Sequence, residues 1–282
     1  LIANPEKATN CRALVRRAAR LLEEHHRTVW CDPTTAAMVN GELPSAKSLD
    51  DLERRSDLLL VFGGDGTILR VARDLAGLPV PLLGINAGHL GFLTAVQVDH
   101  LNQALKKIVA GRFEIEERAL LEATVQRGRE STTHKALNDF VLSRGAASRL
   151  IELEVQVNGE LLTRYRCDGF IASSPTGSTA YSLAAGGAIV SPDAQVLVLT
   201  PICPHTLSIR PVVVGLQSCV QVTLLSERLV ATLTADGQPA SELGRGDTVT
   251  IRRSERALKL LRLEGTSFFS TLRQKLGWSG SN

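Results

Sequence analysis

The sequence has few cysteines, and none of them falls in a recognisable motif. Its 282 residues include only five, with no CxxC pair among them. They are Cys11, Cys31, Cys167, Cys203 and Cys219. An odd, scattered set indicates neither a disulfide framework nor a zinc site, and the pair Cys203 and His205 is too small to hold a metal. We therefore expect a reducing compartment and a cytoplasmic protein.

Long apolar runs and a strong net charge are also missing. No apolar stretch approaches the ~20 residues of a transmembrane helix, so we expect no membrane partner. Residues 11–27 are rich in arginine and resemble an amphipathic helix rather than a signal peptide. A formal net charge of +3, with the basic residues dispersed, gives no support for nucleic acid as a partner. The chain does not begin with methionine, and we expect natural residues before Leu1.

The composition is that of a folded protein with a sizeable core. Hydrophobic residues make up 44% of the chain and charged residues 22%. The length suits one large domain or two ordinary ones. Neither repeats nor a low-complexity linker interrupt the sequence.

Strands and helices alternate through residues 1–115. Helical spacing of apolar residues predicts helices over 9–26 and 67–76. Apolar runs predict strands over 1–4, 28–31, 57–62 and 80–86. The run at 57–62 is almost wholly apolar, which is typical of a parallel sheet covered on both faces. This rhythm predicts an N-terminal Rossmann-like open α/β domain over residues 1–115.

The pattern changes to strand and turn near residue 115. Residues 151–157 alternate apolar and polar side chains, and Asn158-Gly159 signals a hairpin directly after them. We predict a C-terminal β-sandwich domain over 116–251. Residues 252–282, with a helix over 267–278, are expected to return to the first domain. Two domains without a long linker should pack closely, and we expect the active site in the cleft between them.

A glycine-rich turn, Gly63-Gly64-Asp65-Gly66-Thr67, follows the buried strand at 57–62. Such turns usually receive phosphate, because glycine permits positive φ and lets a ligand approach the backbone. Thr67 is a candidate helix N-cap or phosphate hydrogen-bond partner. The alternative is a simple tight turn in which Asp65 is only a cap. A carboxylate at the centre of a phosphate site therefore needs an explanation.

A second unusual stretch, residues 172–192, gathers small and hydroxyl side chains. It contains Ser173, Ser174, Thr176, Ser178 and Thr179, which no core strand requires together. We expect its hydroxyls and backbone N–H groups to bind a polar ligand, with Tyr181 stacking on a base. The alternative is a helix N-terminus with redundant caps.

Together these motifs resemble the NAD kinase family along nearly the whole chain. The matching segments are Gly63–Thr67, Gly84–Leu93, Asn138-Asp139, Asp168–Gly187, Thr200–Val213 and Asp236–Gln238. GGDGT alone is shared with lipid kinases, whereas the run Thr176–Tyr181 is far more specific. Two departures are Ser174, where threonine is usual, and Ala188, where proline is usual; neither removes a functional group that the interpretation needs.

The resemblance implies transfer of the ATP γ-phosphoryl group to the 2′-hydroxyl of the adenosine ribose of NAD. The acceptor is a neutral alcohol, so a base is needed, and Asp65 suits that catalytic role. A divalent metal, Mg²⁺ or another, would neutralise phosphate charge and so reconcile Asp65 with the phosphates. The metal would be carried with ATP and could lie near Asp65, but protein side chains alone would not hold it. Whether Asp65 is mainly base or mainly metal partner is left open.

The resemblance also implies contacts to both substrates. Phosphates of ATP would meet Gly63, Gly64, Gly66, Thr67 and Arg70. NAD would meet Asp65, Gly66, His89, Phe92, Asn138, Asp139, Arg149, Arg166, Asp168, Thr176, Thr179, Ala180, Tyr181, Ser182, Leu183, Ala184 and Gln238. Within this set, Asn138 and Asp139 are assigned to the nicotinamide-side ribose and Asp168 to the carboxamide. Arg166 is also expected to favour a nucleoside triphosphate over polyphosphate as donor.

Two other functions remain possible from the sequence. A lipid kinase could share GGDGT but would not account for Thr176–Tyr181. A non-catalytic NAD(P)-binding sensor would not need Asp65. The family commonly forms homodimers or homotetramers, and the β-rich domain should have edge strands that pairing would bury, so we expect a homo-oligomer.

Overall fold

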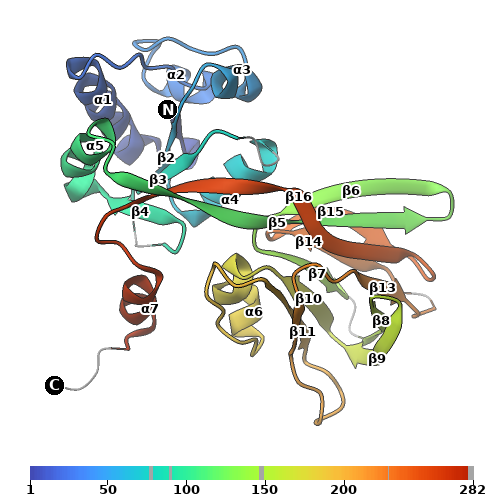
Figure 1. Ribbon diagram of the computed structural model, residues 1–282. Coiled ribbons are helices and arrows are strands. Elements are labelled where there is room, and N and C mark those ends of the chain that lie inside the picture. Colours follow the sequence, from blue (N-terminus) through green and yellow to red (C-terminus); the bar gives the residue numbers. More distant parts are fainter. Residues whose placement is uncertain (76–78, 89–90, 146–148, 228, 279–282) are drawn as a thin grey trace. The chain divides into compact units, whose positions relative to one another are not determined.

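The chain forms two compact units in the computed structural model, which describes residues 1–75, 79–88, 91–145, 149–227 and 229–278 (Figure 1). Unit 1 comprises Leu1–Glu117 and Leu258–Asn282, and unit 2 comprises Arg118–Ala257. Strand β5 (Phe113–Arg127) leads the chain from unit 1 into unit 2, and strand β16 (Thr248–Leu263) leads it back.

Unit 1 is built on a parallel sheet. Its strands are β1 (Ile2–Ala3), β2 (Leu59–Gly63), β3 (Leu82–Asn86) and β4 (Thr94–Gln97), each paired with the next. The end of β16 joins beside β3 through a single parallel pair, Leu260 with Leu82. Every residue of β2 and β3 is buried, which confirms the prediction of a sheet covered on both faces.

Helices cover the two faces of this sheet. On one face, α1 (Ala8–Glu24), α2 (Pro33–Met38) and α5 (Leu101–Val109) share a core with Leu60 and Leu83. Neighbouring strand residues point to opposite faces, so Gly84 belongs to the other face. There the position that a Gly84 Cβ would take lies 3.0 Å from the Cδ1 atom of Ile68, in α4 (Asp65–Leu75), and 2.9 Å from the Leu93 carbonyl oxygen, so this close packing leaves no room for a side chain at 84.

The remaining helical segments of unit 1 have between three and nine residues each. They are the 3₁₀ turns Pro5–Lys7 and Val98–His100, and the α-helices α3 (Leu49–Arg54) and α7 (Phe268–Leu276). The helix predicted over 267–278 is thus present as α7. Among the helices in the described ranges, none is both long enough and apolar enough to cross a membrane.

The prediction of a strand over 28–31 is wrong. This segment forms only one isolated bridge, between Cys31 and Ser45. The carbonyl of Trp30 accepts from the Leu1 ammonium group at 2.5 Å, and Cys31 exchanges backbone hydrogen bonds with Pro44 and Ala46. Proline has no N–H group, so Pro44 cannot donate the next bond of a ladder. The segment therefore pairs through single residues, with Ser45 on one side and with Leu1, just before β1, on the other, where Asp32 also donates to the Leu1 carbonyl at 3.2 Å.

Unit 2 consists of two sheets that share one core. The first sheet runs β6 (Glu130–Ala136), β5, β16, β13 (Val220–Leu224), β8 (Ile151–Val157) and β9 (Glu160–Cys167). The second runs β12 (Val212–Gly215), β11 (Val196–Ile202), β10 (Gly169–Ser173), β7 (Asp139–Ser143), β14 (Ala231–Ala235) and β15 (Gln238–Leu243). Buried residues of both sheets form one cluster, which makes the unit a β-sandwich.

The predicted Asn-Gly hairpin is confirmed between β8 and β9. Asn158 and Gly159 have φ values of +54° and +84°, as a tight hairpin turn requires. The Asn158 side chain also accepts a hydrogen bond from the Cys219 backbone N–H at 2.8 Å. The turn therefore also ties the end of β8 to the residue before β13.

Candidate functional site

The glycine turn of unit 1 lies at the carboxyl end of the parallel sheet. Strand β2 ends at Gly63 and α4 begins at Asp65, and Gly63 is paired with Asn86 at the end of β3. The Ala87 backbone N–H then donates to the Gly63 carbonyl at 3.0 Å. The chain therefore leaves β2 and β3 at the same edge of the sheet, which is where open α/β sheets usually bind their ligands.

Backbone amides hold the carboxylate of Asp65. The Phe92 N–H donates to Oδ2 at 2.8 Å, and the Leu93 N–H donates to Oδ1 at 3.1 Å. A Cβ on Gly91 would lie only 1.9 Å from Oδ1, so this close approach requires glycine. Each carboxylate oxygen accepts one of these bonds and keeps further acceptor capacity, so Asp65 can still receive a proton or contact a cation.

The glycines of the turn leave space for other groups, and this role does not use the positive φ that glycine permits. None of Gly63, Gly64 and Gly66 has a positive φ value. At Gly64 and Gly66, no atom of the described chain lies within 4 Å of the place that a Cβ would occupy, whereas a Gly63 Cβ would lie 2.2 Å from the Thr67 hydroxyl oxygen. Gly63 therefore makes room for Thr67, and the other two leave open space above the helix start.

Two buried polar atoms near this turn have no hydrogen-bond partner among the described residues. They are the hydroxyl oxygen of Thr67 and the Nη2 nitrogen of Arg70, both on α4. Thr67 is the third residue of the helix and so is not its N-cap. Buried donors without an acceptor are rare and cost about 1–3 kcal/mol each. Both atoms are almost fully covered by protein, so a ligand oxygen would reach them only after a side-chain movement.

In unit 2, Asp236 organises the Asn138-Asp139 motif. Its carboxylate accepts from the backbone N–H groups of Leu137, Asn138 and Asp139 at 2.9, 2.7 and 3.3 Å. Asp139 is buried, and that burial, together with the nearby negative charge of Asp236, raises the pKa of the Asp139 carboxyl to about 7. The sequence indicated Asn138-Asp139 and Asp236–Gln238 as separate motifs, but it did not indicate that Asp236 binds the backbone at Asn138-Asp139.

The hydroxyl-rich stretch after β10 uses most of its hydroxyls within unit 2. Ser174 donates to the Leu137 carbonyl at 2.6 Å, Ser178 donates to the Pro175 carbonyl at 2.7 Å, and Ser182 pairs with Thr200 at 3.0 Å. The hydroxyls of Ser174, Ser178 and Ser182 thus have partners within unit 2, and their expected contact with a ligand stays a prediction. They fold the segment into a 3₁₀ turn (Thr176–Thr179) and the short helix α6 (Tyr181–Ala184).

This folding brings two sequence motifs together. A Cβ on Gly177 would lie 2.2 Å from the Asn138 carbonyl oxygen, so the turn rests directly on the Asn138 backbone. Tyr181 stays 48% exposed at the start of α6, which leaves its ring free to stack on a planar ligand. Among the other predicted contacts here, Ala184 is exposed, Thr179, Ala180 and Leu183 are half-buried, and Thr176 is buried.

The remaining predicted contacts in unit 2 are charged or exposed. Asp168 forms an ion pair with Arg144, a residue the sequence did not single out, at 2.6 Å. Arg166 pairs with Glu152 on the neighbouring strand at 3.2 Å, and both side chains are at least half exposed. Arg149 and Gln238 are exposed. His89 lies outside the described residues.

These features are typical of an α/β protein that binds a phosphorylated ligand at its strand ends, joined to a β-sandwich. The chain matches two family models, "ATP-NAD kinase N-terminal domain" over residues 1–113 and "ATP-NAD kinase C-terminal domain" over residues 137–263. The chain belongs to the ATP-NAD kinase family.

Curated relatives agree along most of the chain. NAD kinase of Moorella thermoacetica is 49% identical over 223 residues, covering 79% of this chain and 72% of that protein. NAD kinase of Desulforamulus reducens is 40% identical over 277 residues, covering 98% and 96%.

Two solved structures have the same fold. Yeast NADH kinase in complex with NADH matches with a TM-score of 0.88 and 28% identity, over 96% of this chain and 85% of that one. An NAD kinase from Archaeoglobus fulgidus in complex with ATP matches with a TM-score of 0.74 and 28% identity, over 94% and 95%.

Proposed function

We propose that this chain transfers the γ-phosphoryl group of ATP to the 2′-hydroxyl of the adenosine ribose of NAD, giving NADP and ADP. The family membership of both halves supports this reaction, as do the curated relatives named NAD kinase. The same findings do not favour a lipid kinase or a non-catalytic sensor. The structures of relatives that contain NADH and ATP support NAD and ATP as the two substrates.

The observation that carries the proposed mechanism is the fixed carboxylate of Asp65. The 2′-hydroxyl oxygen forms a bond to the γ-phosphorus, the bond from that phosphorus to the β–γ bridging oxygen breaks, and ADP leaves. The hydroxyl proton must be accepted during this step, and we assign that role to Asp65. The amides of Phe92 and Leu93 hold the carboxylate in one orientation, so little reorganisation is needed.

A divalent cation that arrives with ATP, Mg²⁺ or another, fits the residues around Asp65. Among the described residues, no group of three or more His, Cys, Asp and Glu side chains could form a protein-only metal site. Mg²⁺ is usually bound by one or two carboxylates together with substrate phosphates. Asp65 would be its protein contact, and the cation would neutralise the phosphate charge that otherwise repels this carboxylate.

We assign the substrate contacts from the geometry of each unit. Phosphate oxygens of ATP would lie over the open space at Gly64 and Gly66, and the Thr67 hydroxyl and Arg70 Nη2, which have no partner, would turn toward them when ATP binds. The exposed ring of Tyr181 would stack on the adenine of NAD, and Asn138 and Asp139 would contact a ribose. We further propose a cytoplasmic homo-oligomer that supplies NADP.

The test is a coupled assay of NADP formation from NAD and Mg-ATP. Asp65→Asn should keep the fold but lower turnover by about 10²-fold or more, which is the scale of a lost general base. Asp74→Asn is the matched control, because Asp74 is an exposed carboxylate on the same helix. A folded Asp65→Asn variant with near-normal turnover would remove Asp65 from the mechanism. Phosphorylation of a lipid alcohol but not of NAD would overturn the proposed reaction.

A further inference from the structure

The C-terminal helix α7 is attached to the loop that holds Asp65. The Phe268 ring lies 6.2 Å from the Phe92 ring, centroid to centroid, at an interplanar angle of 42°. The Lys275 ammonium nitrogen lies 5.6 Å from the centroid of the same Phe92 ring, within range of a cation–π contact. Phe92 is also the residue whose N–H donates to Asp65. One residue therefore links α7 to the carboxylate.

Helix periodicity explains why these two side chains reach the same ring. Phe268 and Lys275 are seven residues apart, or two turns, and so lie on one side of α7. Leu272 lies between them on that side and is only 5% exposed. The attached face of α7 therefore consists of three side chains, those of Phe268, Leu272 and Lys275.

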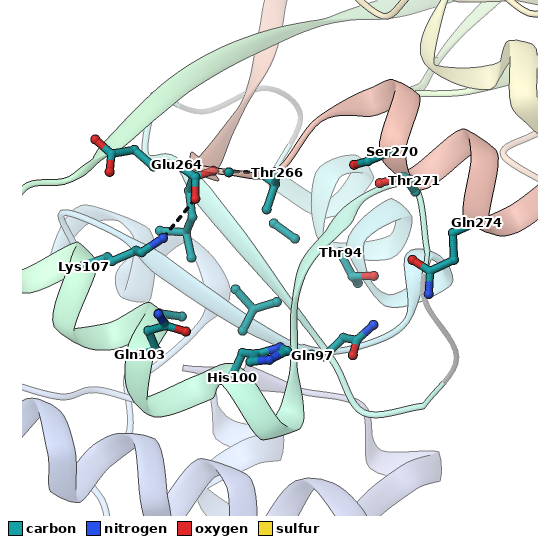
Figure 2. A pocket seen from close by; sticks show the side chains of 15 residues that line it. Thr94, Gln97, His100, Gln103, Lys107, Glu264, Thr266, Ser270, Thr271 and Gln274 are labelled. Atoms are coloured by element: carbon teal, nitrogen blue, oxygen red, sulfur yellow. Dashed lines mark hydrogen bonds between the residues drawn. The ribbon is translucent and has the colours of Figure 1, made fainter. Parts of the chain in front are cut away.

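A second flank of α7 borders an open cavity. Ser270, Thr271 and Gln274 line this cavity of about 340 Å³, together with residues of β4, α5 and the turn after β16. Figure 2 shows them across from side chains that include Thr94, His100 and Gln103. The open space beside this flank gives it little packing.

The turn between β16 and α7 is anchored at its start. Lys107 Nζ donates to the Glu264 carbonyl at 2.9 Å, and the Thr266 hydroxyl donates to the Leu263 carbonyl at 2.8 Å. Gly265 lies in this turn at a φ of +88°, and the capping box of Ser267 and Ser270 begins the helix immediately afterwards. The position of α7 within unit 1 therefore depends on this turn at one end and on its attached face along its length.

We infer that α7 is a positioning element for the reaction, in which Phe268 and Lys275 fix Phe92 so that the amides of Phe92 and Leu93 hold Asp65 ready to accept the proton. This inference rests on the proposed role of Asp65. Phe268 and Lys275 themselves act through Phe92 and need no contact with substrate. Without them the loop can shift, and small misplacements of a catalytic group reduce turnover strongly.

The kinetic test separates positioning from substrate binding. Phe268→Ala should lower kcat by about tenfold to a hundredfold, with the KM for ATP little changed. Phe268→Tyr, which keeps the ring, should restore most of the activity, and Lys275→Met should have a smaller effect in the same direction. Trp278→Ala is the matched control, because this ring just after the same helix is 54% exposed. An equal loss in Trp278→Ala, or no loss in Phe268→Ala, would overturn the inference.

A second readout does not depend on activity. In the wild type, the amide protons of Phe92 and Leu93 should exchange slowly with solvent because they are bonded to Asp65. Phe268→Ala should speed exchange at these two amides, while the strands of the sheet remain protected. Unchanged exchange, or faster exchange throughout unit 1, would refute positioning by α7. If the wild type forms no NADP, the proposed function fails, but the exchange result still decides this inference.

Discussion

At the scale of single residues, two carboxylates lie in contrasting surroundings. Asp65 is half-buried and accepts hydrogen bonds from two backbone N–H groups, whereas Asp139 is buried close to a second negative charge, Asp236. Burial disfavours the charged form of Asp139, and the charge of Asp236 adds to that effect. A carboxyl whose pKa is raised to about 7 changes its charge near neutral pH.

The Asp139 shift predicts a pH-dependent gain in stability for Asp139→Asn. The pKa is about 7 in the folded protein against an ordinary value of 3.8, so stability from this group is fully present below pH 4 and is lost as pH rises through 7. Asparagine carries no charge and avoids this loss. Each pKa unit corresponds to about 1.4 kcal/mol, so the variant should be more stable than wild type by up to a few kcal/mol above pH 7.

Urea unfolding at pH 5 and pH 8 measures this difference. The difference in the free energy of unfolding between Asp139→Asn and the wild type should increase from the lower to the higher pH. Asp193→Asn serves as the control, because hydrogen bonding from Ser191 lowers the pKa of the Asp193 carboxyl, and its loss should not stabilise the protein. A difference in the free energy of unfolding that is the same at both pH values would show that the charged form of Asp139 does not destabilise the folded protein.

At the scale of elements, a substitution at the start of α4 should affect protein stability and ligand binding in different ways. Gly66 is the second residue of the helix, and no described atom lies within 4 Å of the Cβ that alanine would add there. Alanine favours a helix over glycine by about 0.5–1 kcal/mol, so Gly66→Ala should leave the free protein as stable or more stable. It should nevertheless raise the KM for ATP, because the added methyl occupies the space proposed for phosphate.

Thermal unfolding and steady-state kinetics of the same preparations test both parts. Gly63→Ala is the comparison, since its Cβ would lie 2.2 Å from the Thr67 hydroxyl oxygen. That overlap should destabilise the protein by about 1–3 kcal/mol. A Gly66→Ala variant with an unchanged KM for ATP would mean that the open space is not where ATP binds.

The sequence predicted the elements whose signal is local. Apolar runs identified β2 and β3, alternation identified β8, and the Asn158-Gly159 dipeptide placed the hairpin. The run at 28–31 failed as a strand because a ladder needs a partner with free N–H groups, and a single sequence does not show that Pro44 lies alongside.

The candidate site was predictable as a set of motifs but not as an arrangement. The glycine turn identified Asp65, yet the amides that hold it come from 27 and 28 residues further along the chain. The link from Asp236 to Asn138 spans 98 residues. Hydroxyls such as that of Ser182 looked available because sequence does not reveal their internal partners. Such long-range contacts follow from the tertiary fold rather than from local pattern.

At the scale of the whole molecule, the β-sandwich leaves sheet edges that another chain could cover. In the strand order of the described residues of unit 2, β12 and β15 end one sheet, and β6 and β9 end the other. Two of these edge strands carry exposed apolar side chains, Val213 on β12 at 50% and Leu161 on β9 at 57%. Unpaired backbone groups beside apolar side chains favour association, and proteins commonly cover such edges by pairing.

We therefore expect a homodimer or homotetramer that is joined through one of these edges. Light scattering at assay concentration should give a mass of at least two chains for the wild type. A lysine introduced at the edge in use, Val213→Lys or Leu161→Lys, should lower that mass, because an ammonium group buried without a partner is strongly unfavourable. Gln217→Lys is the control, since Gln217 is an exposed polar residue just after β12. A fully active wild-type monomer would refute the expected assembly, and an oligomer unaffected by both lysines would place its interface away from β9 and β12.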